Sequence, residues 1–213
     1  MEKRLLIVGS TSGIGKHCME QALFRGMQVR AFARTADTLQ PHASLDRMVG
    51  DATKPEDVER ALKGVDAVIV TLGIRERLAM LWERETLFSK STEVLLSQMV
   101  QAGVSRLVVV TGYGAGRSQR SMMRLARVGH GLVLGRVYED KTRQEALIET
   151  SDLAWTIARP VILTNRPAAG AARVLEDPAT WRNGFVSREA VASYLLDAVE
   201  HDLNVQMDVV LSS

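Results

Sequence analysis

The sequence contains a single cysteine and no long apolar run, and each of these scarcities excludes a class of protein. Cys18 alone cannot form an internal disulfide framework or a cysteine-cluster metal site. No apolar run approaches the roughly 20 residues that a membrane-spanning helix needs. The 4 histidines are scattered without ligand spacing, so we expect no metal site. Disulfide-rich secreted proteins and integral membrane proteins are therefore excluded.

The chain also lacks an excess of charge of one sign. Its 27 basic and 25 acidic side chains leave a formal charge of +2, which does not indicate a nucleic-acid binder. A four-residue apolar run near the N-terminus leads into glycine-rich sequence and not into a cleavage site, so we expect no signal peptide. We expect a cytoplasmic protein with a small-molecule substrate and neither nucleic acid nor membrane as partner. An oligomer stays open.

Short apolar runs alternate with longer helical stretches along the chain. Continuous apolar strands separated by helices predict a parallel sheet that helices cover on both faces. The expected fold is therefore an α/β, doubly wound, Rossmann-like single domain over residues 1–213, with substrate loops at about 113–136 and 164–184. The expected strands are 5–8, 29–33, 46–49, 67–70, 107–110, 155–158 and 207–211, and the expected helices start at 13, 55, 86, 138 and 188.

A glycine-rich turn follows the first expected strand and opens the first expected helix. Residues 9–15 read Gly-Ser-Thr-Ser-Gly-Ile-Gly. The first glycine lets the chain turn, the second lets the backbone approach a diphosphate, and the third lets helix and strand pack closely. Free N–H groups and the helix dipole then bind the anion. The turn predicts a dinucleotide site, with a ligand-free tight turn as the alternative, and its residues are Gly9, Thr11, Ser12, Gly13, Ile14 and Gly15.

The residues that end the second expected strand bear on which dinucleotide binds. An NAD-specific site has Asp or Glu here for the ribose hydroxyls, whereas arginine suits a 2′-phosphate. Arg34 stands at this position, and Thr35 adds a hydroxyl. A guanidinium can bind phosphate and stack on adenine. The sequence therefore predicts NADP(H) in preference to NAD(H), with a solvated surface arginine as the alternative.

The Gly-x3-Gly-x-Gly spacing resembles that of the short-chain dehydrogenase/reductase superfamily. Further segments resemble its atypical, NAD(P)H-binding branch, which includes flavin reductase/biliverdin-IXβ reductase and the NmrA-like proteins. These segments are Gly-Asp-Ala at 50–52, Val-Thr-Leu-Gly at 70–73, Val-Val-Thr-Gly at 109–112, Tyr-Glu-Asp-Lys at 138–141 with Glu145, Ser-Asp-Leu-Ala-Trp-Thr-Ile-Ala-Arg-Pro at 151–160, and Phe-Val-Ser-Arg-Glu-Ala-Val-Ala at 185–192.

The resemblance implies cofactor contacts at the carboxyl ends of the strands. A dry, apolar wall is expected against the nicotinamide, since the cofactor supplies the chemistry and the protein supplies its orientation. The implied contacts are Asp51 and Ala52 at the adenine, Leu72 and Gly73 along the ribose, Thr111 and Lys141 near the nicotinamide end, and Pro160, Val161 and Ile162 as the wall.

The catalytic pattern of the superfamily is altered in this chain. Many members use Tyr-x3-Lys, but Tyr138 and Lys141 are three residues apart, and no asparagine occurs in the helix expected over 86–102. Either spacing puts the pair on one helix face, and an ammonium nearby favours phenolate. The candidates for catalysis are therefore Thr111, Tyr138 and Lys141. Alternatively, Tyr138 packs in the core and Lys141 pairs with Glu145.

Residues 94–138 include no acidic residue but six arginines. One interpretation is a substrate lid whose arginines attract a carboxylate or phosphate. The other is a solvated helix that buries a methionine side, with Met122 and Met123, on the sheet. The role of this segment stays open, and its arginines are Arg106, Arg117, Arg120, Arg124, Arg127 and Arg136.

Together these features predict an NADP(H)-dependent oxidoreductase that reduces a flavin, a quinone or a small carbonyl compound by hydride transfer. The alternative is a non-catalytic NADP(H)-binding module of NmrA-like type that senses redox state, which the altered catalytic pattern favours. The substrate itself is not predicted, because its pocket depends on residues 113–136 and 164–184.

Overall fold

One sheet of eight strands, in the order β3-β2-β1-β4-β5-β6-β10-β8, organises the part of the chain that the structure describes. This computed structural model describes residues 3–73, 86–121 and 124–213, and the side chains of 120–134 lie outside the description. Only β8, at the edge, runs antiparallel to its neighbour. The strands are β1 Arg4–Val8, β2 Gln28–Ala33, β3 Leu45–Val49, β4 Ala67–Val70, β5 Arg106–Val110, β6 Ala154–Pro160, β8 Arg173–Leu175 and β10 Met207–Ser212.

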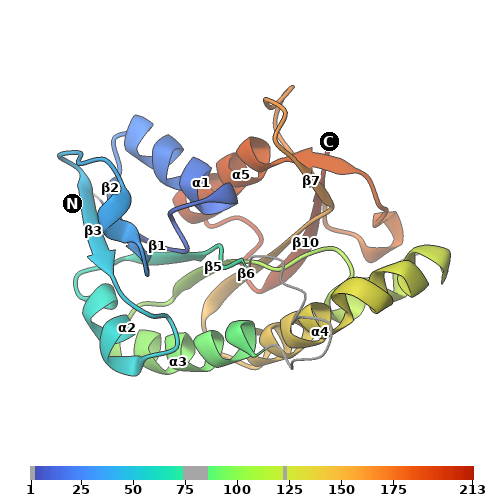
Figure 1. Ribbon diagram of the computed structural model, residues 1–213, viewed down its shortest axis with the longest axis horizontal. Coiled ribbons are helices and arrows are strands. Elements are labelled where there is room, and N and C mark those ends of the chain that lie inside the picture. The colour runs from blue at the N-terminus through green and yellow to red at the C-terminus, as the bar shows by residue number, and fades with distance from the viewer. Residues whose placement is uncertain (1–2, 74–85, 122–123) are drawn as a thin grey trace.

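Helices form a layer on each face of this sheet, as Figure 1 shows. Side chains alternate along a strand, so β1 supplies both cores: Leu5 and Ile7 pack into one, and Leu6 and Val8 into the other. The predicted doubly wound α/β fold is therefore confirmed. One layer contains α1 Gly13–Phe24 and α5 Arg188–Glu200, and the other contains α2 Pro55–Leu62, α3 Leu87–Ala102 and α4 Arg124–Glu149.

The strand order reverses between β1 and β4. The chain moves outward from β1 through β2 to β3, and then returns to the other side of β1 with β4, β5 and β6. Loops that leave the carboxyl ends of β1 and β4 diverge at such a point and leave a crevice where ligands bind in this class of fold. The glycine-rich turn follows β1 directly and therefore lies at this crevice.

Most predicted elements are found within one or two residues of their expected bounds. The expected start of α5 at residue 188 is confirmed, and Ser187 caps this helix because its Oγ accepts a hydrogen bond from the Ala190 N–H at 3.0 Å. Gly103 ends α3 in the left-handed conformation, with φ of 68°. Within the described residues, no helix is both long and apolar enough to cross a membrane.

Two predictions about the segments between elements need correction. The helix expected to start at Tyr138 starts at Arg124, so much of the expected loop at 113–136 is η3 Gly116–Ser121 and the first part of α4. The expected loop at 164–184 contains β8 and η4 Pro178–Thr180. A small parallel ribbon of β7 Ile162–Thr164 and β9 Phe185–Ser187 borders this second segment.

Candidate active site

The glycine-rich turn has the backbone geometry that its sequence predicts. Gly9 turns the chain off β1 with φ of 90°, a conformation that side chains other than hydrogen rarely allow. A Cβ on Gly15 would lie 2.2 Å from the Gly9 carbonyl oxygen and 2.4 Å from Thr71 Oγ1. The close packing of α1 on β1 and β4 therefore requires glycine at position 15.

The start of α1 fits an anionic ligand. Ser12, the residue before the helix, forms no capping bond through its side chain, and the first turn contains no acidic residue. The first N–H groups of a helix and its dipole then remain for an anion. Ser10 Oγ is also fully buried in this turn and has no hydrogen-bond partner within the described residues. These features fit the diphosphate of a dinucleotide.

Arg34 and Thr35 are exposed at the carboxyl end of β2, where a 2′-phosphate is expected. In the described part of the chain, Arg34 forms no salt bridge, so its guanidinium is available to donate hydrogen bonds to a phosphate. The pKa of the Asp51 carboxyl is lowered mainly by the hydrogen bond from the Thr53 N–H, with Arg34 and Lys54 adding positive charge nearby. Two basic side chains, Arg34 and Lys54, therefore lie near this corner of the crevice.

The residues expected at the adenosine lie beside this corner. Asp51 Oδ1 accepts hydrogen bonds from the Thr53 N–H and hydroxyl, both at 2.9 Å, which fixes the turn after β3. Ala52 and Leu72 line one apolar cavity together with core residues from β1, β2 and β4. Among the described residues, no atom lies within 4 Å of the place where a Cβ on Gly73 would stand. Apolar side chains therefore lie next to a fixed polar turn at the place expected for the adenosine.

The three candidate catalytic residues are brought together at the end of β5. Lys141 Nζ donates a hydrogen bond to the Thr111 carbonyl oxygen at 2.5 Å. The Tyr138 hydroxyl lies 3.0 Å from the place where a Cβ on Gly112 would stand. The Thr111 hydroxyl donates to Glu145 Oε1 at 2.6 Å. The α4 face that bears the tyrosine and the lysine thus packs on the residues that follow β5.

Burial sets the protonation of this pair. It raises the pKa of Tyr138, so the phenol keeps its proton at neutral pH and can act as a donor. It lowers the pKa of Lys141 to about 8, although Glu145 and Asp140 oppose the shift. The expected stabilisation of phenolate by the lysine is thus outweighed by desolvation.

Lys141 does not form the ion pair with Glu145 that was its alternative role. Glu145 instead forms a two-point ion pair with Arg159, in which Nε lies 3.0 Å from Oε1 and Nη2 lies 2.8 Å from Oε2. Lys141 Nζ lies 4.8 Å from the centre of the Phe88 ring. The lysine is therefore held by a carbonyl and an aromatic face.

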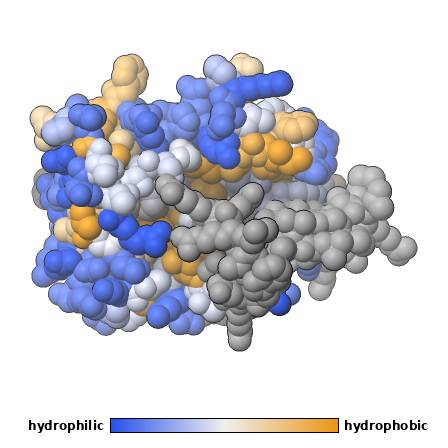
Figure 2. All heavy atoms as spheres, in the orientation of Figure 1, coloured by the Kyte–Doolittle hydropathy of each residue, from blue (hydrophilic) through white to orange (hydrophobic). Residues whose placement is uncertain are grey.

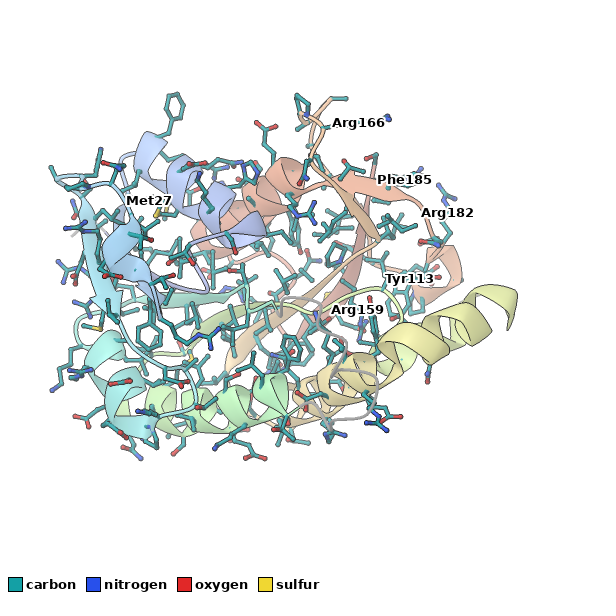
Figure 3. All side chains as sticks on the ribbon, in the orientation of Figure 1. Met27, Tyr113, Arg159, Arg166, Arg182 and Phe185 are labelled. Atoms are coloured by element: carbon teal, nitrogen blue, oxygen red, sulfur yellow. The ribbon has the colours of Figure 1, made fainter. Side chains whose placement is uncertain are left out.

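A buried ionic network behind Thr111 was not predicted from the sequence. Arg159 is fully buried and joins Glu145 to Asp208 on β10, and Arg117 from η3 pairs with the same aspartate. The Trp181 ring lies 5.1 Å from Arg117 and 5.2 Å from Arg159. The network ties η3, α4, β6 and β10 together behind the candidate catalytic residues, and Figure 3 shows Arg159 inside the molecule above α4.

The expected nicotinamide wall is partly buried and partly exposed. Pro160 is buried, and Val161 is 6% exposed and bonded to β10 through its N–H. Ile162 is 50% exposed and lies opposite Phe185, which is 62% exposed, in the β7–β9 ribbon. Figure 2 shows apolar surface on this face of the molecule, near β7 and the start of α5. Residues 160–162 therefore run from the interior to the surface, where Ile162 and Phe185 form an exposed apolar pair.

The arginine-rich segment is divided among different places. Arg106 is buried at the amino end of β5, where it donates to the carbonyls of Ala154 and Ala198. Arg117 belongs to the ionic network, and Arg136 is exposed on α4. Neither Met122 nor Met123, nor the side chains of Arg120, Arg124 and Arg127, lie within the described residues. No metal-binding group of His, Cys, Asp and Glu is found in the described part of the chain.

Comparisons with known proteins agree with this fold. A 3-beta-hydroxysteroid dehydrogenase of Mycolicibacterium neoaurum is 35% identical over 112 residues, which are 49% of this chain and 31% of that relative. ChuY, an anaerobillin reductase from Escherichia coli O157:H7, has a TM-score of 0.81 at 24% identity, covering 99% of this chain and 97% of its own. A Veillonella parvula short-chain dehydrogenase/reductase in complex with NADP has a TM-score of 0.83 at 17% identity, covering 100% and 95%.

The two solved structures share the fold, and the aligned dehydrogenase shares only part of its length with this chain. A family model described as NAD(P)H-binding matches residues 9–202, from the first glycine of the turn to the end of α5 and just beyond. The match spans the turn, the end of β5, the α4 pair and the β6 wall. The chain therefore belongs to the NAD(P)H-binding family.

Proposed function

We propose that this protein is an NADP(H)-dependent reductase that acts on a flavin, a quinone or a small carbonyl compound. The observation that carries the proposal is the packing of Tyr138 and Lys141 of α4 on Thr111 and Gly112 after β5, at the same sheet edge as the glycine turn after β1. A cofactor bound at that turn would extend along this edge toward the candidate acid/base pair.

Each part of the crevice has a separate task in this proposal. The N–H groups of residues 9–15 bind the diphosphate, and Arg34 with Thr35 binds the 2′-phosphate. Asp51, Ala52, Leu72 and Gly73 hold the adenosine. The bound nicotinamide supplies a hydride, and the β6 wall of Pro160, Val161 and Ile162 excludes water from the face that delivers it.

The proton for a carbonyl substrate comes from Tyr138 in this proposal. Its raised pKa keeps the hydroxyl protonated, so it can donate to an oxygen that gains negative charge. Lys141 holds the Thr111 carbonyl and adds positive charge nearby. A flavin or quinone does not require a proton from the protein in the same step. The exposed side chains of Ile162 and Phe185 offer an apolar surface on which a flat ring can pack.

One observation favours the second candidate, a non-catalytic NADP(H)-binding module. The Thr111 hydroxyl already donates to the buried Glu145, which leaves it only as an acceptor toward a ligand. Such a hydroxyl supports the shape of the loop and does not donate to a substrate oxygen.

Turnover measurements separate these two functions. The purified protein is mixed with NADPH and, in separate reactions, with FMN, riboflavin, menadione and a set of aldehydes, and the loss of NADPH absorbance is followed. We expect oxidation with at least one class and a slower rate in Tyr138→Phe if that class is carbonyl. Tight NADPH binding without turnover on any of them would instead support the binding module.

A further inference from the structure

The junction between β9 and α5 contains an arginine that neither the fold nor the proposed contacts explain. Ser187 caps α5 through the Ala190 N–H, and Arg188 is the first residue of the helix. A cation at this end is opposed by the helix dipole, which favours negative charge there. The stability of α5 therefore does not account for arginine at this position.

The side chain of Arg188 reaches the N-terminus of the neighbouring helix. Its Nε lies 3.9 Å from the place where a Cβ on Gly13 would stand. The two helices lie side by side in one layer (Figure 1), and Gln21 Nε2 donates to the Glu189 carbonyl at 3.0 Å. The guanidinium is thus held beside the glycine at which the backbone is expected to approach a diphosphate.

The orientation of this guanidinium is fixed by a neutral partner. Arg188 Nη1 donates to Asn165 Oδ1 at 2.7 Å, just after β7. No carboxylate lies within ion-pair distance of Arg188 among the described residues, and Glu189 accepts from the Ala168 N–H. The side chain is half-buried, so its charge is less screened than that of a surface arginine. An anchored, half-buried cation without an anion is ready for an anionic ligand.

We propose that Arg188 binds an oxygen of the cofactor diphosphate, on the side opposite the main-chain N–H groups of residues 9–15. The ligand would then be held between two positive groups, the N-terminus of α1 and the guanidinium that α5 supplies. Asn165 is the positioning residue, because it aligns the guanidinium. The inference rests on the proposed binding of NADP(H) at the glycine turn and adds a contact from the other end of the sequence.

Two ligands distinguish this contact from the one proposed for Arg34. NADPH contains both the 2′-phosphate and the diphosphate, whereas adenosine 2′-monophosphate contains the 2′-phosphate and no diphosphate. Dissociation constants of both are measured by calorimetry for the natural chain, Arg188→Gln, Arg188→Lys and Arg34→Gln. Arg173→Gln, which removes a charge from exposed β8, serves as the matched control.

The expected result is selective. Arg188→Gln raises the dissociation constant of NADPH by about tenfold to a hundredfold, which is the range expected for a lost charge-assisted hydrogen bond. The dissociation constant of adenosine 2′-monophosphate changes by less than about twofold. Arg188→Lys loses less, because it keeps the charge without the planar fork. Arg34→Gln weakens both ligands, and Arg173→Gln weakens neither. Circular dichroism and thermal melting check that each variant folds.

Two outcomes would overturn the inference. If the Arg188→Gln variant binds NADPH as tightly as the natural chain does, the guanidinium makes no contact with the diphosphate. Equal weakening of both ligands would show that its effect does not act through the diphosphate. Failure of the natural chain to bind any pyridine dinucleotide is a different result, and it would contradict the proposed function itself.

Discussion

At the scale of single residues, the environment of Thr111 depends on charges that water does not reach. Glu145 is 1% exposed and Arg159 fully buried, and the hydroxyl of Thr111 belongs to the same bonded group. Removal of one partner from a buried ion pair leaves the other charge without compensation, which costs more than the pair itself contributes. The carboxylate of Glu145 is therefore expected to support both the fold and the loop after β5.

Substitution of Glu145 by Gln tests this expectation. We expect a loss of about 2–4 kcal/mol in the free energy of unfolding, measured by urea titration, because Arg159 loses one of its two carboxylates. Glu139→Gln, an exposed change on the same helix, should have an effect within about 0.5 kcal/mol. Equal stability of the two variants would refute a structural role for the network.

The lowered pKa of Lys141 predicts a stability that depends on pH. Burial lowers this pKa from 10.5 to about 8, so between these values the unfolded chain binds more protons than the folded one. The free energy of unfolding should therefore rise with pH across that window, by about 2 kcal/mol more in the natural chain than in Lys141→Met. Urea titrations at pH 7.5 and 10 measure the difference, and parallel changes in the two proteins would contradict the assignment.

At the scale of elements, α3 takes its N-terminal cap from α4. Asp140 is fully buried; its Oδ2 accepts from the Phe88 N–H at 2.8 Å, and its Oδ1 accepts from the Ser89 hydroxyl at 2.5 Å. The side chain of Thr86, which precedes the helix, does not cap it. The aspartate between Tyr138 and Lys141 therefore couples α3 to α4.

Asp140→Ala should loosen the start of α3 more than the rest of the fold. We expect a loss of about 1–3 kcal/mol in unfolding free energy and faster hydrogen exchange at the Phe88 and Ser89 amides. Asp140→Asn, which keeps one acceptor oxygen, should lose less. Unchanged exchange at these two amides in Asp140→Ala would show that the cap does not hold the helix.

The elements that could be predicted are those with local signals. Apolar runs predicted β1 and β4, and the predicted start of α5 at residue 188 is also found. The start of α4 was missed because Gly129, Gly131 and Gly135 disfavour a helix by propensity, and packing of the helix against α3 is not visible in a sequence. The glycine-rich turn of residues 9–15 was predictable because its three glycines lie within seven residues of the chain.

The partners of Arg159 and Arg188 could not be predicted, because the fold brings them from far along the sequence. Asp208 lies 49 residues from Arg159, and Gly13 lies at the other end of the chain from Arg188. Both arginines were visible as residues of a family pattern, but their contacts required the three-dimensional arrangement.

At the scale of the whole molecule, the two ends of the parallel sheet have different roles. At the amino end, Arg106 donates to the carbonyl oxygens of Ala198 in α5 and of Leu203 in the loop that follows it. At the carboxyl end lie the glycine turn after β1, Arg34 after β2 and the residues after β5. Ligands bind at the carboxyl end of the sheet in folds of this class. The proposed cofactor site and Arg106 therefore lie at opposite ends of the sheet.

Calorimetric titration of NADPH and NADH into the natural chain and into Arg34→Gln tests the central claim most directly. We expect NADPH to bind about tenfold or more tightly than NADH, since one charge-assisted phosphate contact is worth at least about 1.4 kcal/mol, and we expect Arg34→Gln to remove this preference. Absence of binding by both dinucleotides in the natural chain would contradict the cofactor site, and equal affinity for the two would contradict the assignment of Arg34 to the 2′-phosphate.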